Sequence, residues 1–75
     1  MRISARNVVK GTVKSITKGA VNGEVVIEVA EGVEIASVVT LGSIDDLNLE
    51  VGKEAYAVFK ASNTMVATSH TKRGS

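Results

Sequence analysis

The sequence predicts an all-β fold, an OB-like five-stranded barrel with one short helix. Three observations lead to this fold class. The 75 residues suffice for one small domain and no second one. Thirteen valines, against one Phe, one Tyr and no proline, favour strands built from small branched side chains. Short segments of alternating apolar and polar residues, separated by turn-forming residues, recur along the chain.

The first half of the chain predicts three strands. Residues 7–16 alternate loosely between β-branched and polar side chains, and a turn at 18–23 leads to a second alternating segment at 25–30. Glu31-Gly32 predicts a tight turn before a third strand, residues 33–40. The second and third strands are therefore expected to form a hairpin.

The second half predicts a short helix followed by two strands. Ser43 is expected to be the N-cap of the helix, with Asp46 reaching back to it from three residues on. Alternation then predicts strands at 54–60 and 65–69, joined by a turn at 61–64. Together with the first half, this gives five strands and one helix.

The chain is expected to form one domain, residues 1–69, with a disordered tail, residues 70–75, where the alternation stops. Nine basic residues stand against eight acidic ones, but Lys72 and Arg73 lie in the tail, so the domain itself is slightly acidic. A nucleic-acid-binding barrel would need a basic stripe and several aromatic stacking residues. The composition therefore disfavours a nucleic-acid partner.

The sequence gives no support for catalysis. It has no cysteine, its one histidine is His70, and no serine lies in a nucleophile-elbow motif. Asp45 and Asp46 are adjacent carboxylates, but a position at the start of a helix explains them as capping and dipole partners. We therefore expect no enzyme, no catalytic residues and no direct ligands for a metal cation.

Self-association is expected from the size of the chain. A core this small stabilises a fold only marginally, and the lack of cysteine and the single histidine exclude disulfides and nearly exclude a structural metal. No apolar run approaches the length that crosses a bilayer, and no signal-peptide core follows Met1. We expect a cytoplasmic homo-oligomer with no membrane association.

Three segments together resemble a known family. They are SARN at residues 4–7, TLGS at 40–43 and LNLEVGKEAYAVFKAS at 47–62. In this combination and spacing they resemble the molbindins (the Mop family), small cytoplasmic molybdate-binding proteins related to the TOBE domains of molybdate transporters and regulators. The resemblance covers residues 1–69. It implies an OB-like barrel assembled as a hexamer, a trimer of dimers, with molybdate or tungstate bound between subunits.

The resemblance also implies an oxyanion-binding ligand set. One subunit would contribute Ser4, Arg6, backbone N–H groups around Ala5, and Lys60, and its neighbour would contribute Thr40 and Ser43. Such a set of cationic and hydroxyl donors suits a dianion, and the net binding free energy of about 8 kcal/mol corresponds to micromolar binding or tighter. Phosphate keeps a proton that would need an acceptor, so we expect discrimination against it. For a second class of anion site, the turn at 18–23 is one possibility, although an ordinary hairpin turn explains it better.

The sequence therefore predicts an oxyanion-binding protein for storage of molybdate or tungstate and for molybdenum homeostasis, without an organic cofactor. Two alternatives stay open: a sensing or oligomerisation module that acts on a partner protein, and an OB barrel that binds nucleic acid. A pterin ligand is disfavoured, because one Tyr and one Phe offer little stacking surface.

Overall fold

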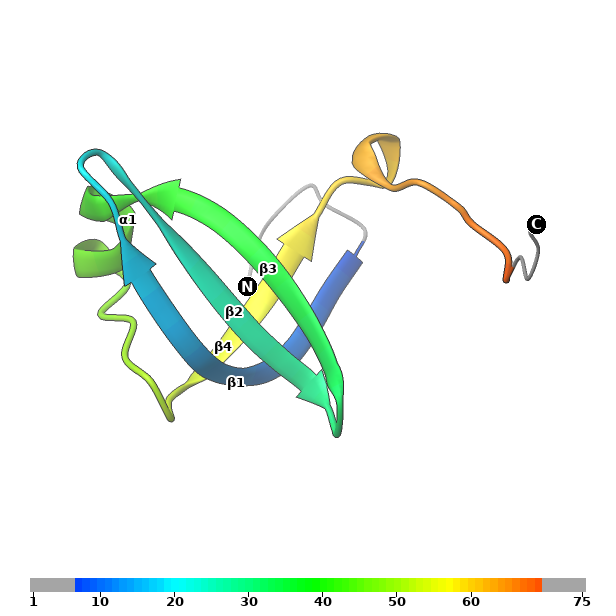
Figure 1. The fold of residues 1–75 in the computed structure, drawn as a ribbon, viewed down its shortest axis with the longest axis horizontal. Coiled ribbons are helices and arrows are strands. Elements are labelled where there is room, and N and C mark those ends of the chain that lie inside the picture. The colour runs from blue at the N-terminus through cyan, green and yellow to red at the C-terminus, as the bar shows by residue number, and fades with distance from the viewer. Residues whose placement is uncertain (1–6, 70–75) are drawn as a thin grey trace.

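The computed structural model describes residues 7–69. Within them, four strands form one antiparallel sheet, in the order β3-β2-β1-β4, and a short helix lies at one end of this curled sheet (Figure 1). The elements are β1 (Asn7–Lys18), β2 (Asn22–Ala30), β3 (Val33–Thr40), α1 (Leu41–Asp46), β4 (Glu54–Phe59) and a 3₁₀ turn, η1 (Ala61–Asn63). The predicted all-β class with one short helix is confirmed.

Strand β1 belongs to both halves of the curl. Residues 7–12 pair with β4, and residues 12–18 pair with β2. Gly11 lies in the bend, where an added Cβ would come within 2.5 Å of the carbonyl oxygen of Glu28. Just after it, the register with β2 shifts between Val13 and Ser15. A glycine and a bulge are the usual means by which one strand turns sharply enough to close a small barrel.

The core lies inside the curl and is small. Its buried residues are Val13, Val25, Ile27, Ile44, Ala55 and Ala57. On β2 and β4 they alternate with exposed or half-buried residues, as expected of strands with one face on the core. Ile44 of α1 closes the end of the curl. The helix is therefore part of the core and not a surface addition.

The helix begins earlier than the sequence indicated. The predicted N-cap, Ser43, is wrong, because Thr40 is the N-cap and its side chain accepts a hydrogen bond from the backbone N–H of Ser43. Asp46 is the last helical residue, so it cannot take part in the start of the helix. The physical reason is apolar spacing: Leu41 and Ile44 are three residues apart, and both pack against the core, so the first turn must include Leu41.

The fifth strand predicted at 65–69 is not confirmed. After η1 the described chain continues to Ser69 without pairing to any strand, and Met65 and Val66 are 93% and 92% exposed. Figure 1 shows this orange segment leading away from the sheet. Strands β3 and β4 are consequently both edge strands, and the expected barrel is open between them. The predicted disordered tail, 70–75, lies outside the described residues.

Substituting Gly11 with alanine is expected to destabilise the fold by about 1–3 kcal/mol, because the new methyl group would collide with backbone atoms of Glu28 that cannot move aside. The matched control is Gly42→Ala in α1, where an added Cβ has only the Thr40 hydroxyl nearby, at 3.9 Å, and where alanine improves helix propensity. Urea unfolding of both variants measures the difference. Equal midpoints for the two variants would contradict the role given to Gly11.

Candidate oxyanion-binding site

Two predicted ligands meet at the junction of β3 and α1. The Thr40 hydroxyl donates to Ser43 Oγ over 2.9 Å and accepts from the Ser43 backbone N–H over 3.1 Å. Ser43 Oγ is therefore an acceptor in this pair, which leaves its own proton free to donate to another group. The last residue of a strand and the first turn of a helix thus present a preformed hydroxyl pair.

Lys60 lies at the other end of the sheet, directly after β4. Its carbonyl oxygen accepts two hydrogen bonds, from the backbone N–H of Asn63 at 3.0 Å and from the Thr64 hydroxyl at 3.1 Å. These bonds form η1 and fix the backbone from which the Lys60 side chain projects. Lys60 itself is exposed. Its ammonium group is accessible to an anion.

Most other lysines in the described part of the chain are neutralised. Lys10 pairs with Glu54 at 3.6 Å, Lys53 pairs with Glu50 at 3.7 Å, and Lys14 pairs with Glu34. The hydrogen bond with Glu34 also raises the pKa of Lys14 above its ordinary value. Among residues 7–69, these pairs leave Lys18 and Lys60 without a carboxylate within salt-bridge distance. Lys60 is therefore one of two candidate cations in this part of the chain.

The structure does not bring Lys60 to the hydroxyl pair within one chain. Lys60 follows Phe59, which pairs with Asn7 at the beginning of β1, whereas Thr40 pairs with Asn22, beyond the end of β1. The length of β1 separates the two groups, and Figure 1 shows α1 and the orange turn η1 at opposite ends of the sheet. A single anion cannot contact both groups of one chain. Such a ligand set can be complete only if two chains contribute.

The remaining predicted ligands, Ser4, Ala5 and Arg6, lie outside the described residues. The described chain begins at Asn7, which is paired with Phe59, the residue before Lys60. The connectivity therefore allows residues 4–6 and Lys60 to belong to one half of a site. The hydroxyl pair of Thr40 and Ser43 would belong to the other half.

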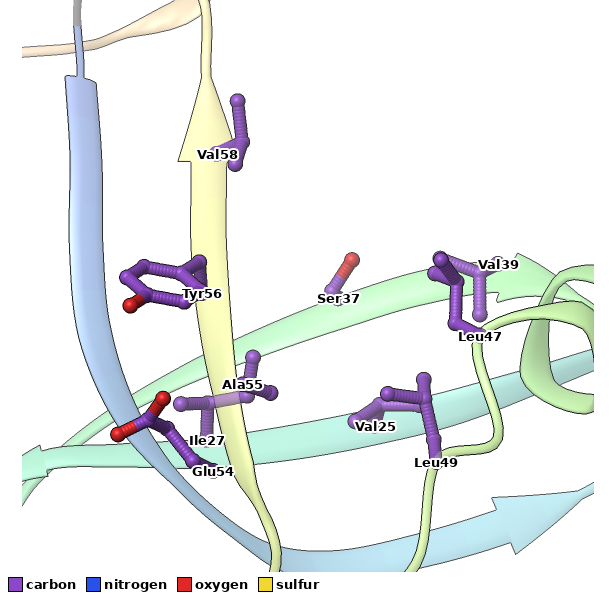
Figure 2. Close-up of a pocket in the computed structure, with 10 residues that line it drawn as sticks. All are labelled: Val25, Ile27, Ser37, Val39, Leu47, Leu49, Glu54, Ala55, Tyr56 and Val58. Carbon is purple, nitrogen blue, oxygen red and sulfur yellow. The ribbon is translucent and has the colours of Figure 1, made fainter. Parts of the chain in front are cut away.

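An apolar groove between β3 and β4 was not predicted from the sequence. The hollow has a volume of about 440 Å³. β3 contributes Ser37 and Val39 to its lining, and β4 contributes Tyr56 and Val58 (Figure 2). A second hollow, of about 560 Å³, shares these residues and extends to Asn63 and Thr64. The lining is mostly apolar and offers no cationic donor, so the groove is not an oxyanion site. A sequence signal existed, since Tyr56 and Val58 are apolar residues on the face of β4 opposite the buried alanines.

Other kinds of site find no support in the described residues. Residues 7–69 contain no group of three or more His, Cys, Asp or Glu side chains arranged to hold a metal ion. No helix in the same range has the length and hydropathy needed to span a membrane.

Residues 3–66 match the TOBE domain model. The chain belongs to the TOBE domain family. It is 53% identical, over 88% of its length and 96% of the relative's, to a probable molybdenum-pterin-binding protein from Haemophilus influenzae. It is 46% identical to molybdenum-pterin-binding protein 3 of Clostridium pasteurianum, over 88% of this chain and 97% of that one. The resemblance to the Mop family is therefore confirmed.

Three solved structures share the fold of this chain. MopII from Clostridium pasteurianum superposes with a TM-score of 0.82 at 42% identity, covering 89% of this chain and all of that one. A molybdate-binding protein from Sporomusa ovata gives 0.83 at 37% identity, covering 91% and 100%. ModG, a cytoplasmic molybdate-binding protein solved with molybdate bound, gives 0.79 at 51% identity, covering 84% of this chain and 45% of ModG.

Replacing Thr40 with alanine is expected to lower the free energy of unfolding by about 1 kcal/mol, because α1 loses the side chain that caps it. Ser43→Ala is the matched control, since Ser43 contributes to the cap through its backbone N–H, and its loss should change stability by less than about 0.5 kcal/mol. Urea unfolding measures both. A larger loss in the Ser43 variant would contradict this assignment of the cap.

Proposed function

We propose that this TOBE domain is a cytoplasmic, non-enzymatic protein that binds molybdate or tungstate between subunits of a homo-oligomer and stores it. The observation that carries the proposal is the division of the donors: an accessible Lys60 at one end of the sheet and the Thr40–Ser43 hydroxyl pair at the other. Relatives named for binding molybdate or molybdenum-pterin support the choice of ligand.

The donor chemistry suits a tetrahedral dianion. Lys60 and Arg6 can only donate hydrogen bonds. The Ser43 hydroxyl can also donate one, because its own proton is not used in the bond with Thr40. Molybdate and tungstate are fully deprotonated at neutral pH, so each oxygen can accept from such a set. Phosphate carries a proton that needs an acceptor, and the proposed ligands include no carboxylate. The site should therefore reject phosphate.

The separation of the proposed ligands within one chain also implies that subunits associate. An anion held by Ser4, Arg6 and Lys60 of one subunit and by Thr40 and Ser43 of its neighbour requires at least a dimer. We propose a hexamer, a trimer of dimers, as the state in which these sites are repeated by symmetry. Binding would then be linked to association, because only the assembled form presents complete sites.

A sensing role is the second candidate. The chain is 41% identical to the molybdenum transport protein ModE of Azotobacter vinelandii over 91% of this chain but only 25% of ModE. The same kind of domain thus occurs inside longer proteins, where it could report anion binding to attached parts. Pull-down of partner proteins with and without molybdate separates sensing from storage, since only a sensing module should change its partners with the anion.

Titration calorimetry with molybdate at physiological salt is expected to give micromolar or tighter binding. Lys60→Ala and Arg6→Ala should each weaken binding by about 10–100-fold, which corresponds to the loss of one charge-assisted hydrogen bond. Lys53→Ala is the matched control, because Lys53 is an exposed lysine that pairs with Glu50 at 3.7 Å and lies outside both the ligand set and the turn at 18–23. Unchanged affinity in the Lys60 and Arg6 variants would refute the ligand set.

Competition experiments test the identity of the ligand. Excess phosphate is expected to leave molybdate binding unchanged, because its proton finds no acceptor in the site. Tungstate should compete effectively, since its charge and size are nearly those of molybdate. A soluble pterin is the informative third competitor, given the names of two relatives. Displacement of molybdate by phosphate would contradict the proposed donor set.

A further inference from the structure

An asparagine–glycine pair lies at the start of β2, beside the hydroxyl pair of Thr40 and Ser43. Asn22 is the first residue of the strand, it is exposed, and Gly23 follows it. Across the sheet, Asn22 is the register partner of Thr40, whose hydroxyl donates to Ser43 Oγ. The turn between β1 and β2 and the helix α1 therefore lie at the same end of the sheet (Figure 1).

Two contacts hold Asn22 close to the start of α1. Residues directly opposite each other in an antiparallel pair have side chains on the same face, with Cβ atoms about 4.5–5.5 Å apart, so the Asn22 amide and the Thr40 hydroxyl are neighbours. The residue before Asn22 is tied as well, because the Val21 carbonyl oxygen accepts a hydrogen bond from the Leu41 backbone N–H over 3.1 Å. A change of charge at residue 22 therefore acts on the hydroxyl pair.

An asparagine that precedes glycine can react with its own backbone, because glycine has no Cβ to obstruct the approach and tolerates the rotation that is needed. The Gly23 backbone nitrogen attacks Asn22 Cγ, a C–N bond forms, and the amide nitrogen leaves as ammonia with the proton of the Gly23 N–H. Water then opens the cyclic imide at either of its carbonyl carbons. The product is aspartate or isoaspartate, and the net reaction consumes water and releases ammonia.

The fold favours glycine at this position and leaves the pair able to react. A Cβ at residue 23 would lie 2.6 Å from Ile44 Cδ1, so a larger residue would have to displace this buried side chain. The pairing of β1 with β2 ends at Lys18 and Gly23, and the pairing of β2 with β3 ends at Asn22 and Thr40. The last pairs of a sheet open at little cost in free energy, so the Asn22 backbone can rotate without unfolding of the core.

We propose that Asn22 is a site of spontaneous deamidation, and that the carboxylate formed there lowers the affinity of the neighbouring hydroxyl pair for an oxyanion. The effect on binding rests on the proposed function, whereas the deamidation itself does not. The proposed ligands are cations and neutral donors, so a carboxylate beside them repels a dianion that they attract. Each protein molecule would therefore lose anion affinity with age, at a rate set by its own sequence.

Peptide mapping of the ageing protein tests the modification. The purified full chain is incubated at mildly alkaline pH, and samples taken over several weeks are digested and analysed by mass spectrometry. Asn22 is expected to convert at least about tenfold faster than Asn7, Asn48 and Asn63, which precede residues with a Cβ and serve as internal controls. Equal rates at all of these positions, or an unchanged Asn22, would overturn the proposal.

Molybdate titration of matched variants tests the effect on binding. Asn22→Asp carries the product of the reaction and is expected to bind molybdate about tenfold more weakly than the unmodified protein, because its charge opposes the dianion at short distance. Higher salt should reduce the difference, since an exposed charge is screened. Asn48→Asp is the matched control, because it makes the same change at an exposed position beyond the end of α1, and Asn22→Gln keeps the amide. Both should bind like the unmodified protein.

Failure of this inference and failure of the proposed function give different results. Tight binding by the unmodified protein, with equal affinity in Asn22→Asp, would reject the effect on binding and leave the oxyanion function standing. A loss of affinity that persists at high salt and also appears in Asn22→Gln would overturn the role given to charge. Absent binding by the unmodified protein would refute the proposed function and the effect on binding together, whereas faster conversion of Asn22 would still establish the modification site.

Discussion

The double pairing of β1 is the constraint on which the rest of the structure depends. The first half of this 12-residue strand pairs with β4 and the second half pairs with β2, and both pairings are possible only if the strand bends sharply between them. Gly11 permits the bend, because the Glu28 carbonyl occupies the space that a side chain would need. The bend wraps β4 over the core and lets Ile44 close one end. It also leaves β3 and β4 as the two edges of an open seam.

Strand β1 also carries two lysines that form ion pairs with glutamates of other strands. Lys10 of β1 pairs with Glu54 of the adjacent β4, and Lys14 pairs with Glu34 of β3, on the far side of β2, so these lysines are neutralised. Exposed pairs of this kind contribute little to stability, but they remove competing cations from the surface. Lys60, at the end of the sheet, has no such partner among the described residues. The described chain therefore presents an accessible positive charge at the β4 end and, at the α1 end, the Ser43 hydroxyl, whose proton is not used by Thr40.

The open edge between β3 and β4 leaves this short chain with a small core. Its core contains only six buried apolar residues, two of them alanine, and no disulfide or described metal cluster supplements it. Apolar side chains of the groove, such as Tyr56 and Val58, and those of Met65 and Val66 are exposed. Bringing these surfaces together buries more apolar area than one chain can bury alone. The proposed homo-oligomer would cover part of this apolar surface.

The sequence by itself determined the all-β class, four strands close to their observed bounds and the position of one short helix, because alternation and turn residues are local signals. Its three family segments also identified the TOBE family. Tertiary structure decided the rest. Thr40 is the cap instead of Ser43, because Leu41 must reach the core. The segment 65–69 alternates like a strand but pairs with no strand in the structure, because strand formation depends on long-range pairing with an edge, which a local pattern does not determine. The separation of Lys60 from the hydroxyl pair likewise depends on long-range pairing through β1, which no local spacing reveals.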